Sequence, residues 1–233
     1  MSKKLKQLKQ QLKKVKIIYI PYIAMISFLQ ERKKRRNLKK YGNHLLNEIC
    51  EFFFKKDLKV FCAFGTLLGL IRDKTLIAWD NDIDMGIVNS ENFSWEEFEK
   101  TLNQFGMKKI RQFIYKGNIT EQTYLKDHIT IDFFLYEVEN GQMSAKVYFR
   151  DPTIKYNSNQ EYSVRIRTSP MVKNISLKRA GDISFLAPDN SEEYLESVYG
   201  RSWRVPDPNY QPDPENKFMI PGTDFGSRNG KAS

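Results

Sequence analysis

The residues best suited to chemistry lie in the segment 60–88, which reads VFCAFGTLLGLIRDKTLIAWDNDIDMGIV. Its second half carries acids at alternate positions, Asp80, Asp82 and Asp84. Side chains two apart on a strand point to the same face, so a strand here would present carboxylates together. Close carboxylates repel each other, and a hard divalent cation that prefers oxygen ligands removes that repulsion. The spacing indicates a site for Mg²⁺ or Mn²⁺, with a polar turn of solvated acids as the alternative.

The first half of this segment is suited to binding phosphate. An apolar run, 60–64, predicts a short buried strand, and Gly65 and Thr66 follow it directly. Glycine lets the backbone come close to a ligand, and successive amides in such a turn can cradle a phosphate. Arg72 could neutralise the phosphate with a bidentate contact, or it could be a structural ion-pair partner. The residues expected to bind substrate here are Gly65, Thr66, Arg72 and Asp80.

Together the two halves resemble the LicD family, which includes the fukutin-like proteins. The family pattern is roughly GTLLG-x-x-R followed by WD-x-D-I-D, and this chain carries GTLLGLIR at 65–72 and WDNDID at 79–84. Asn81 stands where many members have aspartate. The sequence LESVYGRSWRVP at 195–206 resembles the family's C-terminal signature, so the resemblance covers about residues 42–206.

A further acid lies inside a predicted strand. Residues 129–134, ITIDFF, alternate with the period of a strand and carry Asp132 in the middle. A surface-facing aspartate on an edge strand is one explanation. The nucleotidyltransferase folds that the family resembles imply another, in which Asp132 lies beside Asp82 and Asp84, completes a metal site and acts as base toward an incoming hydroxyl. His128 could contact substrate or phosphate, although a lone histidine beside a strand is more often structural.

The resemblance implies a transfer reaction. LicD-type enzymes move a phospho-alcohol, namely phosphocholine, glycerol phosphate or ribitol phosphate, from a CDP-linked donor to a sugar hydroxyl of teichoic acid, lipopolysaccharide, capsule or a lipid-linked glycan. The catalytic and metal-binding residues implied for this chain are Asp82, Asp84 and Asp132. Two alternatives stay open. One is a metal-dependent glycosyltransferase, because Asp82-Ile83-Asp84 is also a D-x-D, and the other is a membrane adaptor with a decayed site.

The surrounding sequence predicts an α/β (α+β) domain over 41–206, with a nucleotidyltransferase-like mixed sheet flanked by helices. Asn140-Gly141 is a strong hairpin signal, and Ser94 is suited to cap a helix. Predicted helices cover 43–56, 95–105 and 191–200, predicted strands cover 107–115, 129–134, 143–149, 162–167 and 182–185, and a polar loop covers 116–121. The tail, 207–233, is rich in Pro, Asp, Asn and Gly, which predicts an extended or disordered segment.

Residues 1–40 form a basic appendage. They contain fourteen Lys and Arg against one acid, Glu31, whereas the other 193 residues have a net charge of −3. Apolar residues first recur at helical spacing, an uncharged run follows at 17–29, and ERKKRR follows at 31–36. Thirteen apolar residues are too few to span a bilayer as a helix, and Pro21 would disturb that helix.

The charge distribution predicts how the chain associates. A basic amphipathic helix beside an apolar run suits an anionic membrane surface, so we expect a cytoplasmic protein, peripheral at the inner face of the membrane. A short signal-anchor and a soluble helical arm that grips RNA or another subunit are the alternatives. The slightly acidic body argues against a broad nucleic-acid footprint, and we expect no nucleic-acid partner. Cys50 and Cys62 are typical of reduced core thiols.

Overall fold

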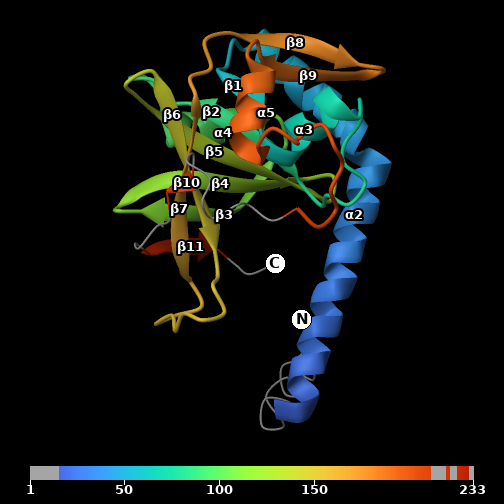
Figure 1. Ribbon diagram of the computed structural model, residues 1–233, viewed down its shortest axis with the longest axis vertical. Helices are drawn as coiled ribbons and strands as arrows, with labels where there is room; N and C mark the ends of the chain where they lie inside the picture. Colours follow the sequence, from blue (N-terminus) through green and yellow to red (C-terminus); the bar gives the residue numbers. More distant parts are fainter. Residues whose placement is uncertain (1–15, 211–218, 221–224, 231–233) are drawn as a thin grey trace.

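The computed structural model describes residues 16–210, 219–220 and 225–230 and has a mixed α+β architecture (Figure 1). The helices are α2 (Lys16–Lys55), α3 (Phe64–Arg72), α4 (Trp95–Gln104) and α5 (Ser191–Tyr199). The strands are β1 (Val60–Cys62), β2 (Ile83–Val88), β3 (Lys108–Tyr115), β4 (Asn118–Lys126), β5 (Ile129–Glu139), β6 (Gln142–Phe149), β7 (Glu161–Pro170), β8 (Ile175–Ala180), β9 (Ile183–Pro188), β10 (Met219–Ile220) and β11 (Phe225–Gly230). The predicted α+β class, a mixed sheet flanked by helices, is confirmed, whereas its nucleotidyltransferase-like arrangement stays a prediction.

A nine-stranded sheet forms the body of the molecule. Its path runs β1-β2-β5-β4-β3-β11-β7-β10, and β6 pairs with both β5 and β7, so the sheet curls round and closes on itself. The β2–β5 pair is parallel and the other pairs are antiparallel. Strands β8 and β9 form a separate hairpin. The sequence pattern did not predict the closure, because it depends on β11, which lies in the expected extended tail.

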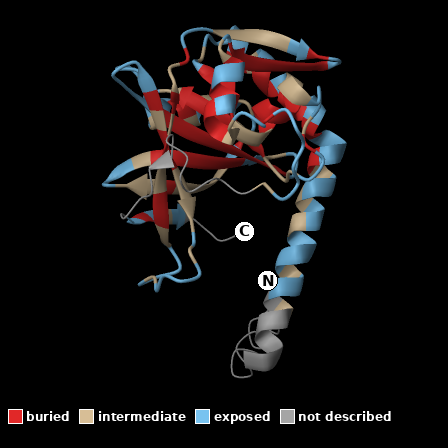
Figure 2. Cartoon of the chain, in the orientation of Figure 1, coloured by how far each residue is buried: buried red, intermediate tan, exposed pale blue. Residues whose placement is uncertain are grey.

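The core lies where the second half of α2 meets the sheet. Leu46, Ile49 and Phe53 of α2 are fully buried. The Phe53 ring meets Phe133 of β5 edge-on, with centroids 5.9 Å apart, and lies 6.1 Å from the ring of Phe98 on α4. Burial is concentrated here and in β2 and β5, whereas residues 24–36 of α2 are mostly exposed (Figure 2). Since buried aromatic rings dominate core energetics, this cluster fixes β5 against α2.

Short sequence signals set the ends of several elements. The Ser94 hydroxyl accepts a hydrogen bond from the Glu97 N–H at 3.5 Å, which caps α4 as predicted. Asn140 and Gly141 have φ values of +51° and +74° and join β5 to β6, which confirms the predicted hairpin. Gly200, with a φ of +79°, ends α5. These boundaries follow from local chemistry alone.

Other elements differ from the sequence prediction. Helix α2 is continuous over 40 residues and passes through Pro21 and the expected boundary at residue 40. Residues 118–121, expected in a polar loop, begin β4, and residues 225–230, expected in an extended tail, form β11. The helical repeat predicted before residue 16 lies outside the described residues. Among the helices that the structure describes, none is long and apolar enough to cross a membrane.

Gly86 of β2 tests how tightly the sheet is packed. A Cβ at Gly86 would lie 2.6 Å from a ring carbon of Phe61 and 2.9 Å from a ring carbon of Tyr136, and both rings are buried. We expect Gly86→Ala to lower the free energy of unfolding by about 1–3 kcal/mol, because the rings have nowhere to move. Urea denaturation measures this, with Met85→Leu as a volume-conserving control that should cost less than about 1.5 kcal/mol. Unchanged stability in Gly86→Ala would contradict the packing.

Candidate functional site

Thr66 joins the two sequence blocks at the centre of the site. Helix α3 begins at Phe64, whose φ is +40°, directly after β1. This turn brings Thr66 against β2, where its hydroxyl oxygen accepts a hydrogen bond from the Asp84 N–H at 2.9 Å. The Ala63 N–H donates to the Asp84 carbonyl at 3.0 Å. The start of α3 is thereby fixed against the acidic strand.

Gly65, predicted to approach a phosphate, lies against a carboxylate. A Cβ at Gly65 would be 2.6 Å from Asp80 Oδ2, so the glycine makes room for this acid. Burial raises the pKa of Asp80 to about 6, while the attraction of Arg35 and Arg72 acts in the opposite direction. Asp80 and Gly65 therefore belong to one corner of the site.

Asp84 and Asp132 lie next to each other on parallel strands. They are register partners in the β2–β5 pair, which confirms the predicted adjacency of the two acidic strands. On the other side of β5, Asp132 is the partner of Thr123 on β4, and Thr123 is the partner of Arg111 on β3. These four side chains form one row across the sheet, because cross-strand partners share a face.

Arg111 and Thr123 hold the carboxylate of Asp132. Arg111 Nη2 donates to both carboxylate oxygens at 3.2 Å, and its Nε donates to Thr123 Oγ1 at 2.7 Å. The Thr123 hydroxyl donates to Asp132 Oδ1. Asp132 is 5% exposed, so the alternative of a surface-facing aspartate on an edge strand is wrong.

Burial and mutual repulsion raise the pKa values of the acids. Burial raises the pKa of Asp82 to about 7, and the charges of Asp132 and Asp80 add to this. The pKa of Asp84 is well above its usual range, again from burial first and then from Asp82 and Asp132. Glu121 of β4 behaves in the same way, through burial and the charge of Asp132. Strongly perturbed acids of this kind gather at functional sites.

The chemistry of the acids suits a divalent cation, because a cation would remove the repulsion that raises their pKa values. In the described ranges, 16–210, 219–220 and 225–230, no three carboxylate, imidazole or thiol side chains converge as a ready-made metal site. Asp132 is engaged by Arg111 instead. Asp82 and Asp84 are the residues that could hold a metal ion, with Asp132 beside them.

Sequence reasoning missed Arg111, Thr123 and Glu121. Glu121 fell in the expected polar loop, although it is 4% exposed and lies in β4. The available signal was the alternation of Glu121 and Thr123 in a stretch that also contains Ile119 and Tyr124, which is compatible with a strand. Arg111 gave no such signal, since basic residues are common on exposed strand positions.

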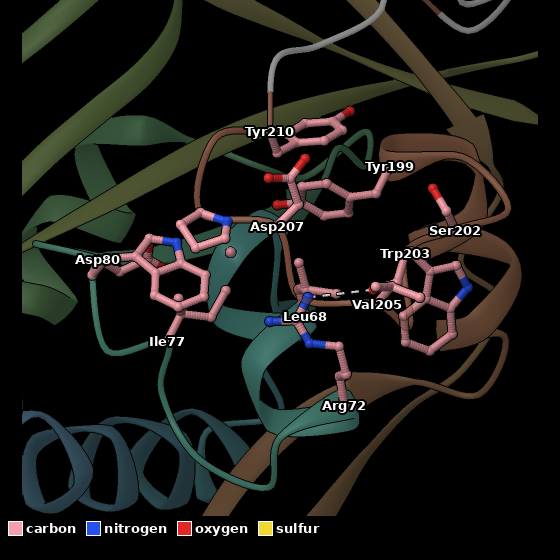
Figure 3. Close-up of a pocket in the computed structure, with 13 residues that line it drawn as sticks. Leu68, Arg72, Ile77, Asp80, Tyr199, Ser202, Trp203, Val205, Asp207 and Tyr210 are labelled. Carbon is pink, nitrogen blue, oxygen red and sulfur yellow. Dashed lines mark hydrogen bonds between the residues drawn. The ribbon is translucent and has the colours of Figure 1, made fainter.

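A pocket of about 300 Å³ opens beside Gly65 (Figure 3). The rings of Tyr199 and Tyr210 stand edge-on in its wall, with centroids 5.2 Å apart. Asp207 lies near these rings, and Asp80 lies across the pocket from them. Burial raises the pKa of Tyr199 well above its usual range, with further contributions from Asp84, Tyr194 and Asp80. The pocket therefore shares one acid, Asp80, with the acidic site.

Arg72 lies in the pocket wall as part of an ion pair. Its Nε and Nη2 donate to the two carboxylate oxygens of Asp73 at 2.8 and 2.7 Å, and its Nη1 donates to the Trp203 carbonyl at 3.4 Å. Arg72 therefore makes the structural ion pair that the sequence analysis gave as the alternative to phosphate binding. Because Trp203 lies in the segment 195–206 that resembles the family's C-terminal signature, Arg72 ties the first sequence block to that segment.

Helix α2 reaches the acids, whereas His128 does not join them. His128 is exposed in the turn between β4 and β5, where the Asn37 side-chain amide donates to its carbonyl at 3.2 Å. The Asn81 amide donates to Glu31 of α2. Burial raises the pKa of Asp82, and Lys34 of α2 partly offsets this by attraction. Glu31 and Lys34 of the basic appendage therefore lie beside the acidic segment, which its composition did not reveal.

Comparison with known proteins agrees with this geometry. Residues 57–172 match the family described as "LicD/FKTN/FKRP, nucleotidyltransferase domain". Residues 57–172 therefore form a domain of the LicD family, a domain typical of transferases of the phosphotransferase type or of proteins with a related glycan-modifying function.

Two relatives come from Rickettsia, and both carry the name "uncharacterized protein". The one from Rickettsia typhi is 22% identical over 121 residues, and the one from Rickettsia prowazekii is 25% identical over 107 residues. The aligned segments cover 52% and 46% of this chain but 37% and 38% of those proteins. The chain therefore spans little more than a third of the length of these relatives.

The raised pKa of Asp82 predicts a pH dependence of stability. An unfolded aspartate has a pKa of about 3.9, whereas that of folded Asp82 is about 7. Between these values the folded protein holds a proton that the unfolded chain has released, so the free energy of unfolding falls as the pH rises. We expect Asp82→Asn to reduce this slope, and Asp57→Asn, at an exposed turn residue, to leave it unchanged. Urea denaturation in EDTA across this range measures both, and equal slopes in wild type and Asp82→Asn would contradict the assignment.

Proposed function

We propose that this protein transfers a phospho-alcohol from a CDP-linked donor to a sugar hydroxyl of a cell-surface polysaccharide or lipid-linked glycan. The observation that supports this most is the pair Asp84 and Asp132 on neighbouring strands, tied through Thr66 to α3 in a LicD-family domain. A nucleotidyltransferase-type site is part of the same proposal, because the acidic strand β2 is hydrogen-bonded to the start of a helix whose second residue is Gly65.

In the proposed reaction, the sugar oxygen bonds to the phosphorus that carries the alcohol. The bond from this phosphorus to the oxygen that bridges to CMP breaks, and CMP leaves with that electron pair. Asp132, oriented by Arg111 and Thr123, takes the proton of the sugar hydroxyl. Asp82 and Asp84 would hold Mg²⁺ or Mn²⁺, which neutralises charge on the donor diphosphate.

The pocket of Figure 3 supports a donor with a cationic alcohol. Its lining includes four aromatic side chains and two carboxylates, those of Trp79, Tyr199, Trp203, Tyr210, Asp80 and Asp207. The positive charge of Arg72 is already paired with Asp73. Aromatic faces and carboxylates attract a quaternary ammonium group, so phosphocholine suits this pocket better than glycerol phosphate or ribitol phosphate.

Thermal stabilisation by candidate donors tests this function. We expect CDP-choline with Mg²⁺ to raise the unfolding midpoint more than CDP-glycerol or CDP-ribitol, because a ligand that binds the folded state stabilises it. Asp84→Asn should weaken CDP-choline binding at least about 100-fold through loss of a metal ligand. Asp57→Asn is the matched control and should bind as wild type does.

The alternative functions give different outcomes in the same screen. A midpoint shift with a UDP-sugar alone, together with release of a nucleoside diphosphate, would favour the glycosyltransferase. No shift with any nucleotide would favour the membrane adaptor. Full CDP-choline binding by Asp84→Asn would rule out the metal-binding role of this acid.

We also propose that the first half of α2 lies on an anionic membrane at its cytoplasmic face. Met25, Phe28 and Leu29 are exposed apolar residues there, and exposed Arg32 and Arg36 follow within two turns. Apolar side chains enter the interface of a bilayer while basic ones attract anionic lipid. A lipid-linked acceptor would be presented at that surface.

Vesicle sedimentation tests the membrane proposal. We expect the protein to bind vesicles that contain phosphatidylglycerol, and to be released by high salt because the attraction of basic residues is screened. Phe28→Asp should reduce binding several-fold, since it removes apolar area and adds repulsion. Phe54→Asp, at an exposed phenylalanine near the other end of α2, is the control. Binding of Phe28→Asp equal to wild type would exclude this segment as the contact.

A further inference from the structure

A second cleft lies between α2 and one end of β3, β4 and β5, and its volume is about 590 Å³. Its polar lining comes from both sides and includes Lys33, Lys34, Lys108, Lys109, His128 and Thr130. Ile110 and Leu125 add apolar surface. The reaction proposed above uses none of these side chains, so the cleft needs its own explanation.

Positive charge dominates the cleft. Two of its four lysines have a carboxylate neighbour, because Glu31 lies near Lys34 and Glu99 pairs with Lys109. Lys33 and Lys108 are exposed and come from the two elements that form the opposite walls. A concave surface with a surplus of one charge attracts and concentrates ligands of the other sign. The cleft is therefore suited to an anionic group.

Thr130 gives an independent sign of a ligand. The residue is 7% exposed, and its hydroxyl oxygen is buried without a hydrogen-bond partner in the described part of the chain. Buried hydroxyl groups in folded proteins are almost always hydrogen-bonded. Because Thr130 lines the cleft, rotation about its Cα–Cβ bond would let this hydroxyl donate to an anionic oxygen bound there.

The cleft adjoins the acidic site. Thr130, Leu125 and Lys108 are register partners across β5, β4 and β3, and Thr130 lies two residues before Asp132. Residues two apart on a strand share a face and are separated by about 7 Å. A group bound at Thr130 is thus about the width of one sugar ring from the carboxylate proposed as the base.

We propose that this cleft binds a phosphate ester or diphosphate of the acceptor glycan. Thr130 donates to a phosphate oxygen, Lys33 and Lys108 neutralise its charge, and the apolar surface contacts the group attached to the phosphate. The phosphate anchors the acceptor so that the neighbouring sugar hydroxyl reaches the acids. This assignment rests on the function proposed above and adds the chemical class of the acceptor.

Isothermal titration with inorganic diphosphate in EDTA tests the cleft apart from any metal site. We expect wild type to bind and Lys33→Ala/Lys108→Ala to bind at least about tenfold more weakly, because two charge-assisted contacts are lost. Thr130→Val keeps the side-chain shape, removes the hydroxyl and should weaken binding about threefold or more. Lys56→Ala/Lys173→Ala removes two exposed lysines outside the cleft and is the matched control. Circular dichroism checks that each variant is folded.

Two further titrants distinguish the sources of the phosphate. If farnesyl diphosphate binds wild type more tightly than inorganic diphosphate does, and if Lys33→Ala/Lys108→Ala abolishes this tighter binding, the acceptor is lipid-linked. If glycerol 3-phosphate instead binds more tightly than inorganic diphosphate, and the double variant loses this tighter binding, the ligand is a phosphate ester within a polymer. Equal affinities of wild type and the double variant for all three anions would overturn the proposal.

Failure of the anion-cleft proposal can be distinguished from failure of the proposed function. If wild type binds none of CDP-choline, CDP-glycerol and CDP-ribitol with Mg²⁺ yet binds diphosphate through Lys33 and Lys108, the transfer reaction is wrong and the anion cleft stands. If the double variant loses CDP-choline and diphosphate to the same extent, the cleft belongs to the donor and the acceptor assignment is overturned.

Discussion

The parallel pairing of β2 with β5 is the constraint on which the site depends. It sets Asp84 directly beside Asp132, an arrangement that like charges oppose. Parallel neighbours cannot be joined by a tight turn, so the chain between them must cross over, and here the crossover contains α4, β3 and β4. The same crossover delivers Arg111 and Thr123 to the far side of Asp132. The topology that creates the repulsion thus also supplies the groups that balance it.

Charge balance in the site draws on three separate parts of the chain. Arg111 comes from β3, Arg72 from α3, and Lys34 and Arg35 from α2, and each acts on one or more of the acids. Arg111 and Arg72 lie on elements within the body of the domain, whereas Lys34 and Arg35 lie in the part of α2, residues 24–36, that is mostly exposed (Figure 2). The acidic corner therefore depends on the helix that composition alone assigns to a separate appendage.

The sequence predicted well those features that depend only on residues close together in the chain. The apolar alternation around Asp132 indicated its strand, and Asn140-Gly141 indicated the hairpin, because side-chain period and turn chemistry are read within a few residues. What it missed depends on distant pairing. Glu121 looked like part of a loop because its neighbours are polar, and β11 closes the sheet through backbone bonds to β3 and β7 that side-chain pattern does not encode. The catalytic roles of the acids stay a prediction, although their adjacency is confirmed.

A single uninterrupted helix carries both exposed Phe28 and Lys34, the residue whose charge acts on Asp82. An α-helix advances 1.5 Å and turns 100° per residue, so these two side chains are separated by about 9 Å along the axis with a fixed rotation between them. Helix α2 therefore fixes both the distance between these two side chains and the angle between the directions in which they point. In the proposed arrangement it would set the height of the acids above the bilayer and the side they present to it, and its length would be as much a part of the site as its side chains.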